Sequence, residues 1–261
     1  MTVLATGALL LCRAAPVDVR PAALLLREPV LLAPAGEGWT AVVPEGRPWA
    51  KSGEAVDAVA AGWASAVAVA VDRPVLALWW DGDRAGFTLA SGFRRPVGYV
   101  WLADGTPAGE DEAMRTFATR LGLDPVLDLQ ALEPLTRPDP ESDARARLTG
   151  VLGVLTRTGL ALPAGLSAGE PADRLRGAAR AAGAEHLDRL DWRDAVTEGA
   201  LEPWLHGPAA RLLGTVQLTA GLPLVLWGVR CRSAGWVVAG SLLTAHGALT
   251  LAYARIAARR P

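Results

Sequence analysis

The pentapeptide Gly165-Leu166-Ser167-Ala168-Gly169 has the G-x-S-x-G spacing of a nucleophile elbow. That chemistry needs a serine on a tight turn between a strand and a helix, with small neighbours around an oxyanion hole. The preceding Leu160–Leu162 is too short to indicate the parallel strands of such a fold. A local interpretation is favoured: Ser167 and Glu170 form an S-x-x-E capping box, and Pro171 lies near the first turn of a helix.

Asp81 and Asp83 follow the apolar run Val75–Trp80. Two carboxylates at this spacing can hold a divalent cation against diphosphate oxygens. An apolar strand that ends in D-x-D resembles the metal and nucleotide-sugar site of many glycosyltransferases, which implies a metal at Asp81 and Asp83. Asp-Gly is also the favoured dipeptide of a tight hairpin, so Asp81-Gly82 predicts a hairpin turn instead. The turn is the preferred interpretation, and no cofactor is expected.

His246 lies near the middle of the apolar run Gly235–Ala254. An ionisable side chain at that depth in a membrane span indicates a function by default. When the C-terminal segment is folded back about Arg232, Gln217 or Thr219 lies at a similar depth. We expect a Gln217–His246 hydrogen bond that joins two helices and contributes ~1 kcal/mol. The alternative is that His246 handles protons or ions inside an oligomer.

Trp79 and Trp80 are adjacent on a predicted strand, so their indoles face opposite sides of the sheet. One of them can lie in the core, whereas the other needs a second layer, a partner or a ligand. We expect helices on both faces of the sheet. A tryptophan left exposed would instead mark an interaction surface.

The chain has no Asp or Glu after Glu202. Two apolar runs follow, Leu212–Val229 and Gly235–Ala254, and each is long enough for the ~20 residues that cross a bilayer. Gly214, Gly221 and Gly228 recur every seven residues in the first run, and Gly240 and Gly247 repeat this spacing in the second, so each run has a glycine face that lets helices pack closely. The pattern predicts a two-helix transmembrane hairpin and allows a homo-oligomer through its glycine faces.

Charge predicts how this hairpin is oriented. Four arginines flank the hairpin and two lie in its turn, which places both termini in the cytoplasm by the positive-inside rule. Residues 1–202 contain 20 Arg and Lys against 27 Asp and Glu, so this acidic part does not favour nucleic acid as a partner. The two cysteines, Cys12 and Cys231, provide neither a disulfide framework nor a metal quartet.

The predicted fold class is α+β, with an N-terminal antiparallel-sheet domain, a helical bridge and the transmembrane hairpin. The expected divisions are an α+β domain at 1–132, a proline-rich linker at 133–143, a helical membrane-proximal region at 144–206 and the hairpin at 207–261. The predicted strands are Val3–Cys12, Ala22–Leu32, Trp39–Val43, Val75–Trp80, Gly86–Ala90 and Val97–Leu102. The predicted helices are Gly53–Val71, Glu110–Leu121, Ala144–Thr158, Pro171–Ala182 and Glu185–Gly199.

These features favour a two-pass cell-membrane protein whose domain acts as a non-enzymatic interaction or scaffold module at the cytoplasmic face. Its expected partners are the lipid bilayer and another protein, with Trp79 and Trp80 as interaction residues. One alternative is a membrane-bound enzyme that uses a metal at Asp81 and Asp83 on a nucleotide-sugar or lipid-linked substrate. The other is a small oligomeric transport component built around His246.

Overall fold

The structure is a computed structural model, and it describes residues 5–189 together with part of the C-terminal segment. The described C-terminal residues are 215, 219, 221–227, 230–231, 235, 240–241, 243–245 and 247–248. The chain divides into two compact units, Met1–Leu190 and Asp191–Pro261. Each unit is therefore described by itself.

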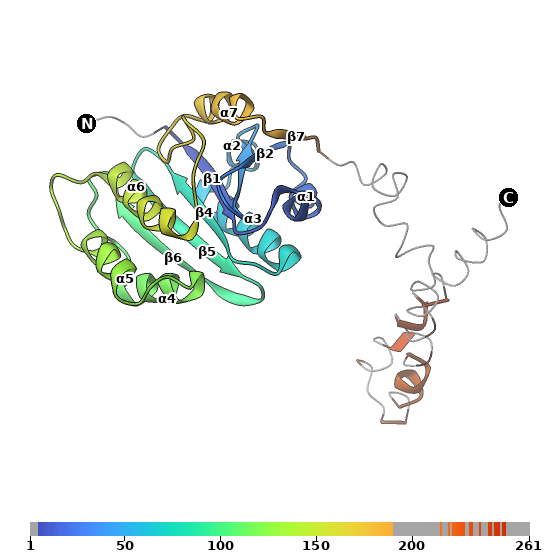
Figure 1. Cartoon of the computed structure of the whole chain (residues 1–261). Coiled ribbons are helices and arrows are strands. Elements are labelled where there is room, and N and C mark those ends of the chain that lie inside the picture. The colour runs from blue at the N-terminus through green and yellow to red at the C-terminus, as the bar shows by residue number, and fades with distance from the viewer. Residues whose placement is uncertain are drawn as a thin grey trace. The chain divides into compact units, whose positions relative to one another are not determined.

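A single antiparallel sheet forms the centre of the first unit (Figure 1). Its spatial order within residues 5–189 is β6-β5-β4-β1-β3-β2-β7. The strands are β1 (Gly7–Cys12), β2 (Val30–Pro34), β3 (Thr40–Pro44), β4 (Val75–Trp80), β5 (Arg84–Ser91), β6 (Arg94–Leu102) and β7 (Glu185–Leu187). The α+β class and the antiparallel sheet agree with the sequence prediction.

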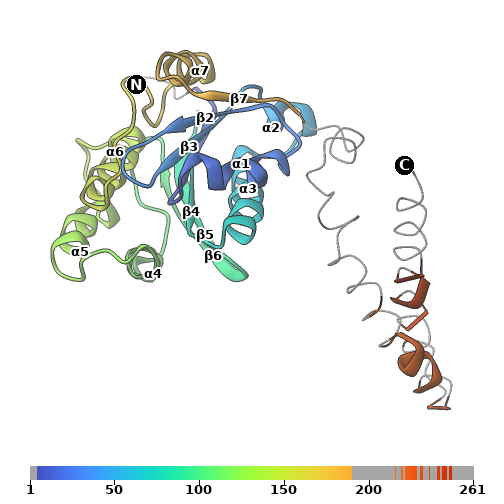
Figure 2. The same cartoon turned by 45° about the vertical axis from the view of Figure 1, so that its right-hand side comes forward.

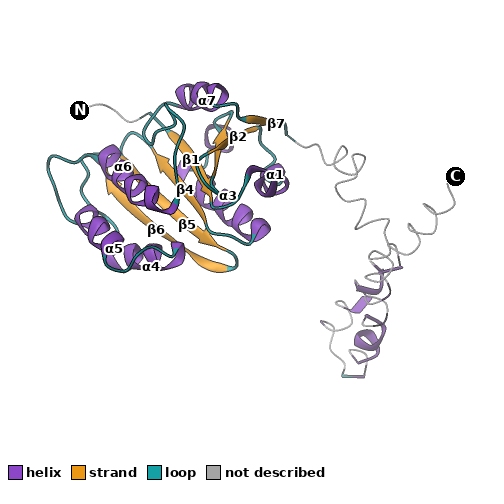
Figure 3. Cartoon of the chain, viewed as in Figure 1, coloured by secondary structure: helices purple, strands orange, loops and turns teal. Residues whose placement is uncertain are grey.

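Helices cover both faces of this sheet, so the unit has three layers (Figures 2 and 3). On one face lie α1 (Pro16–Leu24), α2 (Pro48–Ser52) and α3 (Val56–Val71). On the other lie α4 (Asp111–Leu121), α5 (Leu127–Leu132), η1 (Glu133–Thr136), α6 (Ala144–Leu155), η2 (Thr156–Thr158) and α7 (Ala172–Ala181).

The sequence of the central strands explains the two helical layers. All six residues of β1 and all six of β4 are buried. Neither strand therefore shows the apolar-polar alternation that is typical of a sheet with one solvent-exposed face. Leu9 and Leu11 point into one core, and Leu10 points into the other. A strand that is apolar on both sides must be covered on both sides, because either bare face would expose a large apolar surface.

Trp79 and Trp80 face opposite cores, as their adjacent positions predicted. Both are buried, with 2% and 0% of their surfaces exposed. The space for these rings comes from two glycines: a side chain at Gly7 would meet the ring of Trp80, and one at Gly86 would meet the ring of Trp79. The second helical layer accounts for the tryptophan pair, so neither indole forms an exposed interaction surface.

Two element predictions are wrong. Residues 22–24 of the predicted strand Ala22–Leu32 belong to α1, and the chain reverses at Arg27, whose φ is +56°, before β2 begins at Val30. The predicted helix Glu185–Gly199 begins instead as β7, because pairing of Leu187 with Val30 satisfies the free edge of β2. The rest of that prediction lies outside the described residues.

The predicted boundary near residue 132 is also displaced. Leu148 and Val151 of α6 and Leu175 of α7 share one core with Leu9 and Leu78 of the sheet. The helices assigned to a membrane-proximal region therefore cover one face of the sheet, and the division falls between residues 190 and 191.

In the second unit, the described residues 221–227 are helical. A side-chain carbon added at Gly221 would lie 3.0 Å from the carbonyl oxygen of Gly240 and 2.5 Å from Thr244 Oγ1. Two helical segments therefore approach each other closely at the glycine pair. Among the described residues, no helix combines the length and the apolar character that a membrane crossing requires.

A cluster around Glu45 holds β7 and α7 against the rest of the first unit. Arg180 of α7 donates to Glu45 Oε1 over 2.5 Å, and His186 Nε2 lies 2.8 Å from Glu45 Oε2. Partial burial by itself raises the pKa of Glu45, but these hydrogen bonds outweigh it and leave the pKa below its ordinary value. The charged carboxylate thus stabilises the folded form.

We expect Glu45→Gln to weaken this fastening at neutral pH. A lowered folded-state pKa contributes stability that is complete above the unfolded pKa of about 4.3 and is lost as the pH falls through the folded value. The Tm of the variant should lie below that of the wild type at pH 7, and the two should converge in acid. Near-ultraviolet circular dichroism between pH 7 and pH 3 measures this, with Glu112→Gln in an exposed pair as the control. A pH-independent gap would contradict the prediction.

Candidate functional site

A groove of about 440 Å³ lies between α4 and the segment formed by α5 and η1. This volume is within the range of small ligand sites and shallow peptide sites. Met114 of α4 and Leu129 and Leu132 of α5 supply its apolar surface. Asp111, Arg115, Glu133 and Arg137 supply charges of both signs at its rim.

The mouth of the groove carries exposed apolar side chains. Val126 lines the groove with 58% of its surface exposed, and the adjacent Leu127 is 61% exposed. Apolar residues surrounded by charges of both signs are typical of a surface that binds another protein segment. The groove is therefore suited to an amphipathic partner.

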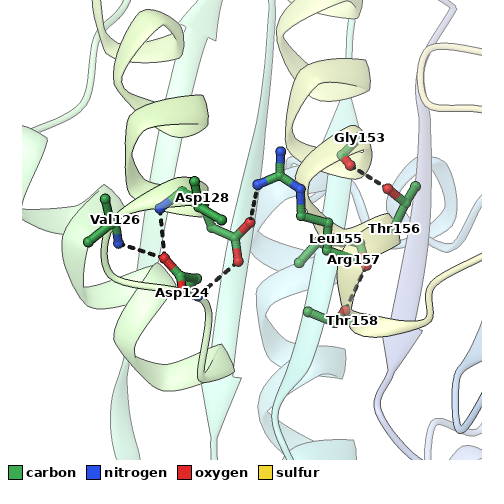
Figure 4. A network of polar contacts seen from close by, with 9 residues as sticks. Asp124, Val126, Asp128, Gly153, Leu155, Thr156, Arg157 and Thr158 are labelled. Carbon is green, nitrogen blue, oxygen red and sulfur yellow. Dashed lines mark hydrogen bonds and ion pairs between the residues drawn. The ribbon is translucent and has the colours of Figure 1, made fainter.

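A polar network fixes the α5 wall of the groove (Figure 4). Asp128 of α5 is 4% exposed, and its Oδ1 accepts a hydrogen bond of 2.7 Å from Arg157 Nη1 in η2. Its Oδ2 accepts a second bond, of 2.8 Å, from the backbone amide of Asp124. The buried carboxylate thus has a partner on each oxygen, and it ties α5 to the end of α6.

Asp124 orders the turn that leads into α5. Its Oδ1 accepts hydrogen bonds from the backbone amides of Leu127, at 2.7 Å, and Val126, at 2.8 Å. These bonds stabilise the charged form and lower the pKa of Asp124. The orientation of Val126 at the groove mouth follows from this turn.

Buried donors fix η1, which continues the α5 wall. Arg147 of α6 is 2% exposed, and it donates to the carbonyl oxygens of Pro134, at 2.6 Å, and Arg137, at 2.8 Å. Trp101 of β6 donates through Nε1 to the carbonyl oxygen of Leu135 at 2.7 Å. The segment 133–143, predicted as a linker, is therefore bound to the first unit where it passes η1.

Aromatic packing fastens α4 to the sheet behind the groove. The ring centroid of Phe117 lies 4.6 Å from that of Phe87, and that of Tyr99 lies 4.9 Å from that of Trp101. Burial and the nearby charge of Asp111 raise the pKa of Tyr99. The Tyr99 hydroxyl and Arg147 Nε are buried and have no hydrogen-bond partner among the described residues.

Besides its apolar and charged residues, the groove is lined by the polar side chains of Gln130 and Thr136. In the described part of the chain, no three His, Cys, Asp or Glu side chains are close enough to hold a metal ion.

Asp81 lies where the hairpin interpretation placed it. Its Oδ1 accepts hydrogen bonds from the backbone amides of Asp83, at 3.0 Å, and Arg84, at 2.9 Å, which closes the turn between β4 and β5. Its Oδ2 lies 3.5 Å from Arg84 Nε, and the side chain of Asp83 is exposed. A metal ion at Asp81 would have to displace Arg84.

The capping-box prediction is wrong. Helix α7 has Pro171 as its N-cap, and no side chain caps it. Glu170 instead pairs with Arg145 of α6 and with Arg174, which lies one helical turn further along the chain. Ser167 is exposed in the preceding turn. The ion pairs explain this outcome, because two guanidinium groups stabilise the carboxylate more than a single amide would.

The predicted pair Gln217 and His246 lies outside the described residues. Sequence reasoning also missed Asp128 and Arg147, the buried charges that fix α5 and η1. A signal for Arg147 was present, since it lies next to Leu148 and four residues before Val151 on the apolar face of α6. The sequence held no signal for the burial of Asp128, because its partner Arg157 lies 29 residues away.

Comparison with family models, with curated proteins and with solved structures finds no match to this chain.

We expect Asp128→Ala to destabilise the first unit by roughly 1–3 kcal/mol, because it leaves the Asp124 amide and Arg157 without their acceptor. The loss should be largest in α5, so amide hydrogen exchange should accelerate over residues 124–132 first. Glu112→Ala is the matched control, because its pair with Arg115 is exposed on both sides and contributes ~0–1 kcal/mol. Equal effects of the two variants would show that the Asp128 network does not hold the wall.

Proposed function

We propose that this protein is a membrane-anchored interaction module. Its C-terminal hairpin holds it in the bilayer, and the groove of the first unit binds a segment of a partner protein at the cytoplasmic face. The observation that carries the proposal is the close approach of Gly221 and Gly240 in a helical pair whose large apolar side chains face outward.

The distribution of side chains in the second unit supports the anchor. Gly221 and Gly240 are buried, whereas Leu222, Leu226 and Trp227 are 54%, 71% and 61% exposed. A water-soluble helix pair has the opposite arrangement, with its large apolar residues at the interface. Small residues between helices and large apolar residues outside are typical of helices that pack in lipid.

Orientation follows from charge. Arg211, Arg255 and the pair Arg259 and Arg260 flank the hairpin, against Arg230 and Arg232 in its turn. The positive-inside rule places the flanks, and with them the first unit, in the cytoplasm. Because Gly221 and Gly240 contact each other within one chain, a homo-oligomer would have to use other positions of the hairpin.

We expect the full-length protein to stay in the membrane pellet after an alkaline carbonate wash. The hairpin would be buried in lipid, and an alkaline wash does not release a protein whose helices cross the hydrocarbon core. A truncated chain of residues 1–206 should appear in the supernatant. Release of the full-length protein by the same wash would refute the anchor.

The groove is tested by photo-cross-linking at position 126. A benzoylphenylalanine in place of Val126 should give discrete cross-linked species in membranes of the native host. The same probe at Val17, which is 74% exposed on α1 at the other face of the sheet, should not. Leu129→Glu should abolish the products at 126, because it places a charge on the apolar lining. Products that are equal at both positions, or that persist in the Leu129→Glu variant, would exclude the groove as the binding surface.

A further inference from the structure

The turn between β5 and β6 presents an aromatic side chain to solvent. Phe93 is 95% exposed, and it follows Gly92, whose φ of +53° suits a two-residue hairpin turn. In Figures 1 and 2 this hairpin projects at the end of the first unit away from α7. A large apolar ring fixed on a short turn cannot fold back into the core.

Three arginines accompany this ring. Arg94 and Arg95 follow Phe93 directly, and Arg73 lies in the connection between α3 and β4. All three are exposed, and none of them pairs with an acidic side chain that the structure describes. Register brings the two segments together, because Val75 pairs with Ala90 at this end of the sheet.

A hollow of about 480 Å³ lies between the two segments, formed by residues 72–74 and 91–94. The Ser91 hydroxyl in its lining is buried and has no hydrogen-bond partner among the described residues. Arg73 and Arg94 line the same hollow, against the single carboxylate of Asp72. The hollow thus has an excess of positive charge from exposed guanidinium groups, which suits a phosphate group.

We propose that this end of the first unit docks on an anionic lipid surface. A phospholipid phosphate binds in the hollow to Arg73 and Arg94, and Phe93 inserts beside it among the acyl chains. A soluble phosphate would satisfy the arginines but would leave the ring in water. An anionic bilayer accounts for both, since interfacial binding combines buried apolar surface with attraction to charged headgroups.

The inference rests on the proposed anchor in one respect. An anchored chain keeps the first unit near a bilayer, which raises the effective concentration of lipid at the turn. The contact itself uses residues of the first unit alone, so the two proposals can fail separately.

The test places an environment-sensitive fluorophore at the turn of the full chain. Phe93→Cys in a Cys231→Ser background is labelled with acrylodan, whose apolar ring replaces that of phenylalanine. Cys12 does not compete, because burial raises the pKa of its thiol to about 12. The labelled protein is studied in nanodiscs of phosphatidylcholine alone and of phosphatidylcholine mixed with phosphatidylglycerol.

We expect a blue shift of the emission in the discs with phosphatidylglycerol and a smaller one in phosphatidylcholine alone. Each arginine near the surface should contribute about fivefold to docking, so Arg73→Ala with Arg94→Ala should weaken docking roughly 25-fold. Arg27→Ala with Arg47→Ala removes the same charge elsewhere and should leave the shift unchanged. The same label at Leu25, which is 64% exposed and follows α1 at the opposite end of the sheet, should not shift.

Several outcomes would overturn the inference. These are an unshifted emission in anionic discs, an equal shift at position 25, or a shift produced by glycerol phosphate without lipid. A shift that needs protein-containing host extracts would assign the turn to a protein partner instead. If the chain does not incorporate into discs, the proposed membrane anchor is refuted. Anionic discs added to the free chain then test separately whether the turn docks.

Discussion

The structure depends on the burial of β1 and β4 on both of their faces. A sheet whose central strands are apolar on each side is stable only between two helical layers, and the chain supplies one layer from residues before β4 and the other from residues after β6. Trp79 and Trp80 show how strict this requirement is. Each needs its own core, and each fits only because a glycine on the neighbouring strand leaves room for the ring.

The second helical layer leaves backbone carbonyl groups that need hydrogen-bond donors, and buried side chains supply them. Closing it requires a proline-rich stretch to cross the unit, and the short 3-10 turn of this stretch satisfies only part of its carbonyl groups. Arg147 and Trp101 donate to three of these carbonyls from inside the core. The groove therefore has walls held by side chains that are themselves buried, which is the arrangement that preorganises a binding site.

Sequence periodicity predicted the parts of the fold whose pattern is local. Val75–Trp80 is a strand as expected, the Asp81-Gly82 turn follows it, and α3 and α4 lie within a few residues of their predicted bounds. The errors occur where distant pairing decides the outcome. Leu187 becomes a strand residue because Val30 offers a free edge, although the sequences are more than 150 residues apart. Neither the groove nor the hollow at Phe93 could be inferred from spacing. Distant partners such as Trp101 and Arg157 fix the α5–η1 wall of the groove, and the hollow combines two segments that only the folded sheet brings together.

The position of β7 has a consequence for how the chain is made. β7 is the last strand within residues 5–189, yet it covers the edge of β2, a strand formed by residues near the start of the first unit. Until synthesis has passed Leu187, the backbone amides and carbonyls along that side of β2 have no partner. An open edge of this kind is a template for pairing with another chain. The nascent protein is therefore most prone to aggregate while almost all of the first unit already exists, and addition of three residues ends that vulnerability before the apolar C-terminal segment is made.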